Sequence, residues 1–252
     1  MPHGRYLFVS DLHLDATAPA AIAQFLHFLD TDAAQCDGLY ILGDLFESWI
    51  GDDDDEPSRA LVCDGLRALT GRGVPCRVQH GNRDFLLGAG FAARTGCVLA
   101  ADPEQLDVGG KRIVISHGDA LCTADTSYQR FRRMVRSRAF QRPWLALPLA
   151  ARRGLAACAR RRSYAHTRRL PVASLDVAPD AVTQLLRATN ADILIHGHTH
   201  RPGVHRLEVD GRERTRIVLG DWYVQGSVLT LHADGRLDSR GLAARPSAPA
   251  HG

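Results

Sequence analysis

The sequence predicts a layered α/β fold, because short runs of β-branched and aromatic residues alternate with longer amphipathic stretches along most of the chain. Five of the short runs stop at a polar cluster, as strands that lead into functional loops do. The length of 252 residues suits one large domain with a sizeable hydrophobic core.

The five predicted strands are residues 6–10, 39–42, 77–79, 113–116 and 193–195. Apolar residues at spacings of three and four predict helices at residues 20–29, 58–70 and 179–188. After these, residues 204–209, 215–219 and 227–232 predict antiparallel strands, with Asp210-Gly211 and Asp234-Gly235 as turn signals. In such sheets reactive groups gather at the carboxyl ends of the strands, where every polar cluster lies.

The expected organisation is a single domain over residues 1–242, with a helical insertion at about 121–170 and a disordered tail rich in Ala, Pro and Ser at 243–252. Six cysteines without a CxxC pair predict buried thiols rather than a zinc ribbon or a disulfide framework. The N-terminus shows no signal-peptide pattern and no apolar stretch of about 18 residues occurs, so we expect a cytoplasmic protein.

Charge is divided unevenly along the chain. Residues 126–175 contain 13 of the 31 basic residues, all arginine, and no acidic residue, which leaves 18 basic against 28 acidic residues elsewhere. Aromatic and aliphatic residues such as Phe131, Phe140 and Trp144 are mixed with these arginines. This mixture favours a membrane surface or acyl chains over a merely solvated helical pair, and it argues against nucleic acid.

Five polar motifs carry the candidate chemistry: DLHL from Asp11, GDLFE from Gly43, GNRDF from Gly81, SHGD from Ser116 and HGHTHRP from His196. One such Asp at a strand end is more often a cap, but five in register predict a metal site. The candidate metal ligands are Asp11, His13, Asp44, Asn82, His117, His196 and His198. Oxygen and imidazole ligands favour Mn²⁺, with Mg²⁺, Fe²⁺ or Zn²⁺ possible, and seven ligands imply two ions.

This ordered set resembles the signature of the calcineurin-like metallophosphoesterases, D-x-H, G-D, G-N-H-[DE], H and G-H-x-H. The resemblance implies a four-layer αββα sandwich whose insertion forms a helical cap. It implies one ion held by Asp11, His13, Asp44 and His198, and a second held by Asp44, Asn82, His117 and His196. In this assignment Asp44 bridges the two ions and His200 has no ligand role.

Arg83 stands where the general signature has a histidine. A guanidinium with a pKa above about 12 cannot protonate a leaving group, whereas it can clamp phosphate oxygens. The substitution therefore favours a leaving group that departs unaided as an anion, as in the cleavage of a pyrophosphate.

GNRDF, SHGDALCTAD, the basic insertion and HGHTHRP together resemble the UDP-2,3-diacylglucosamine diphosphatases of Gram-negative bacteria. The resemblance implies Mn²⁺-dependent hydrolysis of UDP-2,3-diacylglucosamine in lipid A biosynthesis, by water attack on the α-phosphorus, with release of UMP and 2,3-diacylglucosamine 1-phosphate (lipid X). It implies a monomer bound peripherally at the cytoplasmic face of the inner membrane, with two Mn²⁺ per chain.

The implied catalytic residues are Asp44, Asn82, Arg83 and His117, and the implied substrate contacts are Asn82, Arg83, Asp125, Ser163, Thr167, Leu170 and His196. Two of these positions depart from the family, which often has Asn at Thr167 and Lys near Leu170. The phosphate contact expected there is therefore open between Arg168 and Arg169.

Two other functions compete with this interpretation. One is a two-metal phosphodiesterase that acts on a soluble nucleotide, for which the Trp and Leu cluster of the insertion has no use. The other is a binding or scaffold protein without catalysis, which would be expected to have lost ligands. The acidic run 52–56 lacks the spacing of a calcium loop and predicts a solvated loop near the site entrance.

Overall fold

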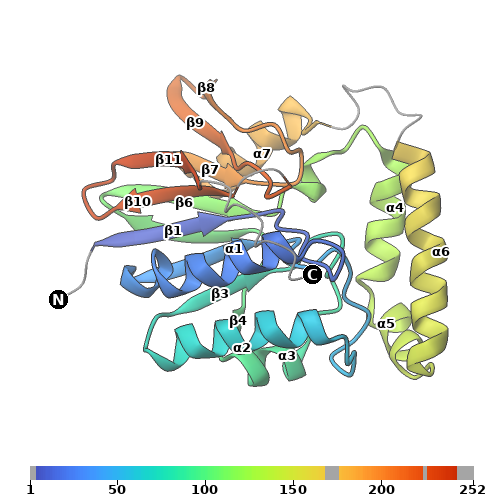
Figure 1. Ribbon diagram of the computed structural model, residues 1–252. Helices are drawn as coiled ribbons and strands as arrows, with labels where there is room; N and C mark the ends of the chain where they lie inside the picture. Colours follow the sequence, from blue (N-terminus) through green and yellow to red (C-terminus); the bar gives the residue numbers. More distant parts are fainter. Residues whose placement is uncertain (1–3, 168–175, 224–225, 243–252) are drawn as a thin grey trace.

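Two β-sheets lie face to face in the computed structural model, which describes residues 4–167, 176–223 and 226–242 (Figure 1). The first sheet has the order β11-β10-β1-β2-β3-β4, and the second has the order β5-β6-β7-β9-β8. The strands of the first are β1 (Arg5–Val9), β2 (Gly38–Leu42), β3 (Cys76–Gln79), β4 (Val98–Leu99), β10 (Ser227–His232) and β11 (Leu237–Gly241). Those of the second are β5 (Glu104–Val108), β6 (Lys111–Ser116), β7 (Ile193–His196), β8 (Gly203–Val209) and β9 (Arg212–Val218).

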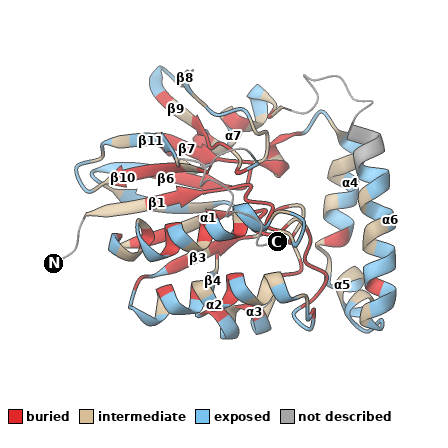
Figure 2. Cartoon of the chain, viewed as in Figure 1, coloured by how far each residue is buried: buried red, intermediate tan, exposed pale blue. Residues whose placement is uncertain are grey.

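The alternation of side chains along each strand separates the core into layers. In β1, Phe8 packs between the sheets with Ile115 of β6, whereas Leu7 and Val9 point to the opposite face. The layer on that opposite face contains helices α1 (Pro19–Asp30), α2 (Pro57–Gly71) and α3 (Ala89–Thr95). Helix α7 (Pro179–Thr189) covers the outer face of the second sheet through Val182 and Leu186. The order helix, sheet, sheet, helix confirms the predicted αββα sandwich, and Figure 2 shows its buried strands.

Every strand and helix predicted above occurs in the structure, with bounds that differ by at most a few residues. The 3₁₀ turns η1 (Ala33–Gln35) and η2 (Asp119–Leu121), helix α3 and strands β4, β5 and β11 were not predicted. Strand β5 alternates between half-buried and exposed positions, and most of β11 is exposed. Their sequences therefore lack the apolar runs by which the buried strands were recognised.

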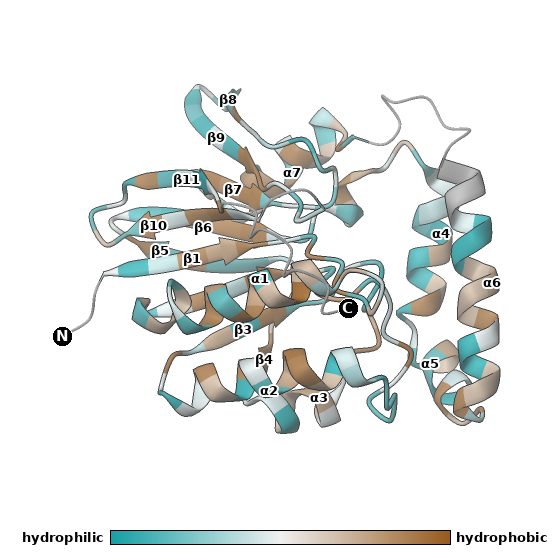
Figure 3. Ribbon diagram, viewed as in Figure 1, coloured by the Kyte–Doolittle hydropathy of each residue, from teal (hydrophilic) through white to brown (hydrophobic). Residues whose placement is uncertain are grey.

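The predicted insertion forms three helices, α4 (Thr126–Val135), α5 (Arg138–Leu145) and α6 (Leu149–Thr167), at one end of the two sheets (Figure 1). We call residues 126–167 the arginine-rich segment; residues 168–170 of the predicted insertion, and the predicted tail 243–252, lie outside the described residues. Figure 3 shows apolar and polar patches mixed along α6, and Figure 2 shows little burial in all three helices.

Polar contacts join the arginine-rich segment to the acidic loop at residues 52–56. Arg152 is 1% exposed, forms an ion pair with Asp53, and donates from Nη1 to the carbonyl of Ile50 at 2.8 Å. Arg153 pairs with Asp54 at 2.8 Å and also with Asp55. Asp52, Asp53 and Asp55 are exposed, as the predicted solvated loop requires, but Asp54 is buried. The sequence did not show that this run of carboxylates is also the counter-charge of two arginines about a hundred residues later.

A second polar joint runs along α4. The buried carboxylate of Asp119 accepts hydrogen bonds at Oδ2 from Tyr128 Oη at 2.6 Å and from Arg132 Nε at 2.7 Å. Arg136 Nη2 lies 3.4 Å from the same oxygen and donates to the carbonyl of Gly81 at 3.1 Å. Helix α4 is thus tied to the loops that follow β3 and β6.

All six cysteines are free thiols, and five of them are buried while Cys158 is exposed. None of the helices in the described part of the chain is both long and apolar enough to span a bilayer.

Candidate metal centre

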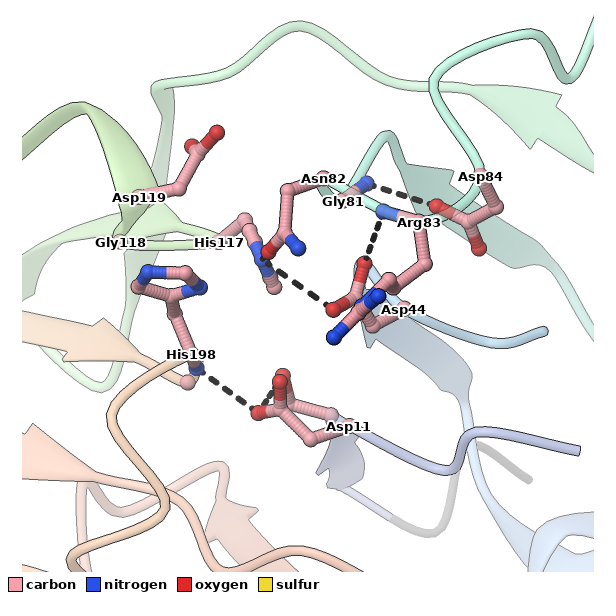
Figure 4. A network of polar contacts seen from close by, with 12 residues as sticks. Asp11, Asp44, Gly81, Asn82, Arg83, Asp84, His117, Gly118, Asp119 and His198 are labelled. Carbon is pink, nitrogen blue, oxygen red and sulfur yellow. Dashed lines mark hydrogen bonds and ion pairs between the residues drawn. The ribbon is translucent and has the colours of Figure 1, made fainter. Parts of the chain in front are cut away.

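The predicted polar motifs converge at the carboxyl ends of β1, β2, β3, β6 and β7. The loops that follow β1 and β2 run side by side, because the amide of Asp11 donates to the carbonyl of Gly43 at 3.2 Å and that of His13 to Asp44 at 2.9 Å. The buried Asp84 carboxylate accepts from the amides of Gly81 and Leu45, each at 2.8 Å, and so fixes the GNRD turn against this pair. Figure 4 shows the result as one cluster of side chains.

Two glycines are required by this close approach. A Cβ atom at Gly81 would lie 2.0 Å from Asp44 Oδ1, and a Cβ at Gly197 would lie 2.3 Å from Asp11 Oδ2. Both distances are far below van der Waals contact, so only glycine can precede Asn82 and His198 in these motifs.

The first group of converging side chains comprises Asp11, His13 and His200. His200 Nε2 lies 3.3 Å from Asp11 Oδ1 and 3.4 Å from His13 Nε2. His13 Nε2 also lies 3.8 Å from Asp44 Oδ2. Asp44 therefore borders this group.

The second group comprises Asp11, Asp44 and His117. His117 Nε2 lies 3.8 Å from Asp44 Oδ2 and 3.0 Å from Asn82 Oδ1. The His198 ring packs against the His117 ring with centroids 5.0 Å apart and an interplanar angle of 66°. The two groups share Asp11, and Asp44 of the second group borders the first, so the two groups adjoin each other.

The hydrogen bonds behind the histidines turn their Nε2 lone pairs toward the carboxylates. Nδ1 of His117 donates to the carbonyl of Leu42 at 2.8 Å, Nδ1 of His13 faces Glu47 Oε2 at 2.9 Å, and Nδ1 of His200 faces Asp221 Oδ2 at 3.4 Å. In the neutral rings each Nε2 is then an acceptor, and within the described part of the chain it lies beside carboxylate or amide oxygens and, for His13 and His200, beside another Nε2. Asp11 Oδ1 is buried and has no hydrogen-bond partner among the described residues. Such a set of converging lone pairs fits divalent cations.

Burial and mutual charge shift the pKa values of this cluster in opposite directions. Burial raises the pKa of Asp44 to about 6. For His117, burial disfavours the charged form, but the stronger attraction of the Asp44 and Asp11 carboxylates raises its pKa to about 9. Burial disfavours the charged form of Asp11, but His200, whose Nε2 lies 3.3 Å from Asp11 Oδ1, and the nearby His117 and His13 hold the pKa of Asp11 below its ordinary value. Without a cation, the carboxylates thus depend on protonated imidazole for compensation.

The structure corrects the register of the HGHTHRP motif. Ile193 and Ile195 of β7 face the layer between the sheets and Leu194 faces α7, so His196 is on the α7 side by alternation. Its Nδ1 faces the Gly197 carbonyl at 2.9 Å, and burial lowers its pKa to about 4. The position assigned to His198 beside Asp11 and His13 is occupied by His200, and the position assigned to His196 near His117 is occupied by His198.

Backbone conformation marks the same residues independently. Asp11, His13, Asp44, His198 and His200 have φ angles of 55°, 49°, 51°, 68° and 53°, in the left-handed region. Residues other than glycine are uncommon there, and they concentrate at functional sites. His196 ends a regular strand and is not among them.

The predicted substrate residues are only partly gathered at this cluster. The Arg83 amide donates to Asp44 Oδ1 at 2.8 Å, and its guanidinium lies 3.8 Å from Glu47 Oε1 (Figure 4 shows Arg83 beside Asp44 and Asn82). Asp125 caps α4 by accepting from the Tyr128 amide at 2.9 Å. Ser163 is exposed on α6, Thr167 is the last residue of that helix, and Leu170 lies outside the described residues.

Three site residues were missed from the sequence: His200, Glu47 and Asp119. For His200 the signal was present, because G-H-x-H counted from Gly197 selects His198 and His200. Glu47 and Asp119 lie inside the GDLFE and SHGD motifs, but their roles depend on contacts that a sequence does not display.

Comparison with known proteins gives consistent relatives. The calcineurin-like phosphoesterase family matches residues 4–202. A UDP-2,3-diacylglucosamine hydrolase of Aeromonas hydrophila is 47% identical over 237 residues, 94% of this chain and 98% of the relative. Enzymes of the same name from Serratia proteamaculans and Stenotrophomonas maltophilia are each 48% identical, over 90% and 91% of this chain and 95% of each relative.

Proposed function

Because the chain belongs to the UDP-2,3-diacylglucosamine hydrolase family of calcineurin-like phosphoesterases, and is therefore a hydrolase, we propose that it cleaves the pyrophosphate bond of UDP-2,3-diacylglucosamine. The products are UMP and 2,3-diacylglucosamine 1-phosphate, an intermediate of lipid A biosynthesis. The observation that supports the proposal is the pair of adjoining Asp and His groups with Arg83 at their edge.

Each metal position has a defined set of side chains. Asp11, His13, Asp44 and His200 hold one ion, and Asp44, Asn82, His117 and His198 hold the other, with Asp44 shared. Carboxylate, amide and imidazole ligands without thiolate suit Mn²⁺. When bound, the ions supply an activated water and neutralise charge on the phosphoryl oxygens.

Arg83 binds and orients the substrate phosphates. Its amide donates to Asp44 Oδ1 at 2.8 Å, and Asp44 borders both metal positions. This hydrogen bond keeps Arg83 next to the metal centre. A guanidinium stabilises the charge that develops on the phosphoryl oxygens in the transition state, but it donates no proton to the leaving group. A phosphate monoester leaves as an anion without such a proton, which matches the proposed α-phosphorus attack.

The arginine-rich segment covers the diacyl part of the substrate and holds the protein at the cytoplasmic face of the inner membrane. Four large apolar side chains of this segment are about half exposed: Phe131 (45%), Met134 (51%), Leu145 (45%) and Leu155 (50%). The segment contains many arginines and no acidic residue. Exposed apolar side chains within a cationic surface suit an anionic lipid surface. The protein acts as a monomer in this proposal.

The test is release of UMP from UDP-2,3-diacylglucosamine in detergent with added Mn²⁺, beside UDP-N-acetylglucosamine and p-nitrophenyl phosphate. Turnover of the lipid substrate alone is expected. If the soluble compounds alone were turned over, the two-metal chemistry would stand, and the protein would be a phosphodiesterase for a soluble nucleotide.

The corrected ligand sets have their own test, in which Mn²⁺ binding is measured by calorimetry. We expect His200→Ala to weaken the affinity for one of two Mn²⁺ ions by more than 10-fold. His196→Gln should bind Mn²⁺ as the unmodified protein does. The reverse result would restore His196 as a ligand.

A further inference from the structure

Glu47, the last residue of the GDLFE motif, touches both halves of the proposed site. Its Oε2 lies 2.9 Å from His13 Nδ1, and its Oε1 lies 3.8 Å from Arg83 Nη1. The three side chains are largely buried, at 4% exposure for His13, 17% for Glu47 and 18% for Arg83. One carboxylate therefore stands between a histidine of the metal centre and the guanidinium proposed to bind the substrate phosphates.

The backbone around Glu47 fixes this carboxylate. The Leu14 amide donates to the carbonyl of Leu45 at 3.0 Å, and the Glu47 amide donates to the carbonyl of Leu14 at 3.2 Å. The Trp49 amide donates to the carbonyl of Arg83 at 3.2 Å. The loops that carry His13, Glu47 and Arg83 are thus hydrogen-bonded to one another, so a shift of one would be passed to the others.

Each oxygen of Glu47 has a distinct consequence. Oε2 accepts the proton of His13 Nδ1, which selects the tautomer whose Nε2 lone pair faces Asp11, Asp44 and His200. Oε1 attracts the guanidinium of Arg83 and limits its rotation, and the short distance allows a Coulomb attraction that partial burial preserves.

We propose that Glu47 is a positioning residue that couples the metal centre to the phosphate clamp, by holding His13 and Arg83 with its two oxygens. The inference rests on the proposed function for the role of Arg83. Glu47 does not touch the reacting atoms; it sets where two other side chains present their groups.

Asp221 provides a matched comparison. Its Oδ2 lies 3.4 Å from Nδ1 of His200, so it stands behind the other histidine of the same group. Arg83, in contrast, pairs with Glu47. Asp221→Asn should therefore disturb metal binding without disturbing the clamp.

The experiment measures two affinities by calorimetry, Mn²⁺ for the metal-free protein and UMP for the Mn²⁺-saturated protein. For Glu47→Gln we expect Mn²⁺ binding at one of two sites to weaken 10- to 100-fold, the range for partners of metal-bound histidines, and UMP binding to weaken several-fold. Asp221→Asn should weaken Mn²⁺ alone. Glu213→Gln, at a surface glutamate paired with Arg206, should change neither.

A double variant isolates the coupling. In the Arg83→Ala background, Glu47→Gln should still weaken Mn²⁺ binding but should no longer change the affinity for UMP, because the shared contact is already lost. Glu47→Gln keeps the shape of the side chain, and Glu47→Ala serves as the stronger variant when its circular dichroism matches that of the unmodified protein.

Wild-type Mn²⁺ affinity in Glu47→Gln, or an undiminished UMP effect in the Arg83→Ala background, would overturn the inference. Neither readout requires turnover of the lipid. If the unmodified protein failed to hydrolyse UDP-2,3-diacylglucosamine, the proposed function would fall, while the two binding readouts would still decide the role of Glu47.

Discussion

The two-sheet body and the arginine-rich segment are held together by different forces. In the body, three clusters of buried apolar side chains fill the layers between sheets and helices. In residues 126–167, where side chains are described as far as Ser163, the buried residues are Val135 and Arg152. The segment is joined to the body by ion pairs at Asp119 and at Asp53, Asp54 and Asp55. Screening by NaCl weakens partly exposed ion pairs but does not weaken apolar burial, so the two regions should respond differently to added salt and to substitutions.

The largest effect is expected when the metal centre in the body is broken. Asp44→Ala removes a carboxylate that borders both metal positions, so turnover should fall about 1000-fold or more, beyond the 10- to 100-fold seen when only an outer partner of a ligand is lost. The rate of UMP release checks this, with exposed Asp64→Ala as the control. Full activity in an Asp44→Ala protein that still binds Mn²⁺ would refute the mechanism. The hydrogen exchange of helices α4 to α6 should not change in this variant, because the substitution lies in the two-sheet body.

Aromatic truncation should separate the regions by stability. Phe25 is fully buried and contacts the rings of Phe28 and Trp222, so Phe25→Ala should lower the free energy of unfolding by about 3–5 kcal/mol. Phe131 is 45% exposed on α4, and Phe131→Ala should change the free energy of unfolding by no more than about 0.5 kcal/mol. Urea unfolding curves for both variants test the contrast. Equal losses would mean that the segment shares the core of the body.

The joint at Asp119 should release one region without unfolding the other. Asp119→Asn keeps the shape of a buried carboxylate but removes the charge that Arg132 and Tyr128 contact. Hydrogen bonds to charged groups contribute about 2 kcal/mol, so hydrogen exchange in α4 should speed up about 30-fold while β1 and β6 keep their protection. The exposed pair of Asp107 and Arg112 supplies the control variant, Asp107→Asn. Uniform loss of protection would show that Asp119 supports the whole fold.

Salt should produce the smallest effect. Raising NaCl from about 0.05 to 0.5 M shortens the Debye length several-fold and weakens exposed pairs such as that of Arg153 with Asp55. We expect hydrogen exchange near the start of α6 to increase about 2- to 5-fold, with no change in the strands. An equal response in both regions would erase the distinction between them.

The sequence predicted the buried strands and their helices because burial imposes a period on apolar residues. Strand β2 is an example, since Leu39 and Ile41 face one layer while Leu42 faces the other. Strand β5, with the sequence EQLDV, is only half-buried and left no such period. The ion pairs of the acidic run 52–56 were not predicted for a related reason, because its partners Arg152 and Arg153 are about a hundred residues away and nothing local identifies them.

The candidate site could be located from the sequence but not resolved in detail. Asp11, His13, Asp44, Asn82 and His117 follow strand ends, and the structure brings them together. HGHTH, in contrast, contains two overlapping H-x-H pairs, and the choice depends on where β7 ends. Because the strand runs through His196, that residue alternates onto the α7 side, and the two histidines after it turn into the site.

The left-handed backbone at five site residues sets stability against activity. Each such conformation costs a side chain-bearing residue on the order of 1–2 kcal/mol that glycine would not incur. Selection for thermal tolerance alone, in a library screened without substrate, would therefore enrich glycine at Asp11, His13, Asp44, His198 and His200. A lineage freed from its catalytic task would lose these five positions early, and the sandwich around them would become more robust as its chemistry disappeared.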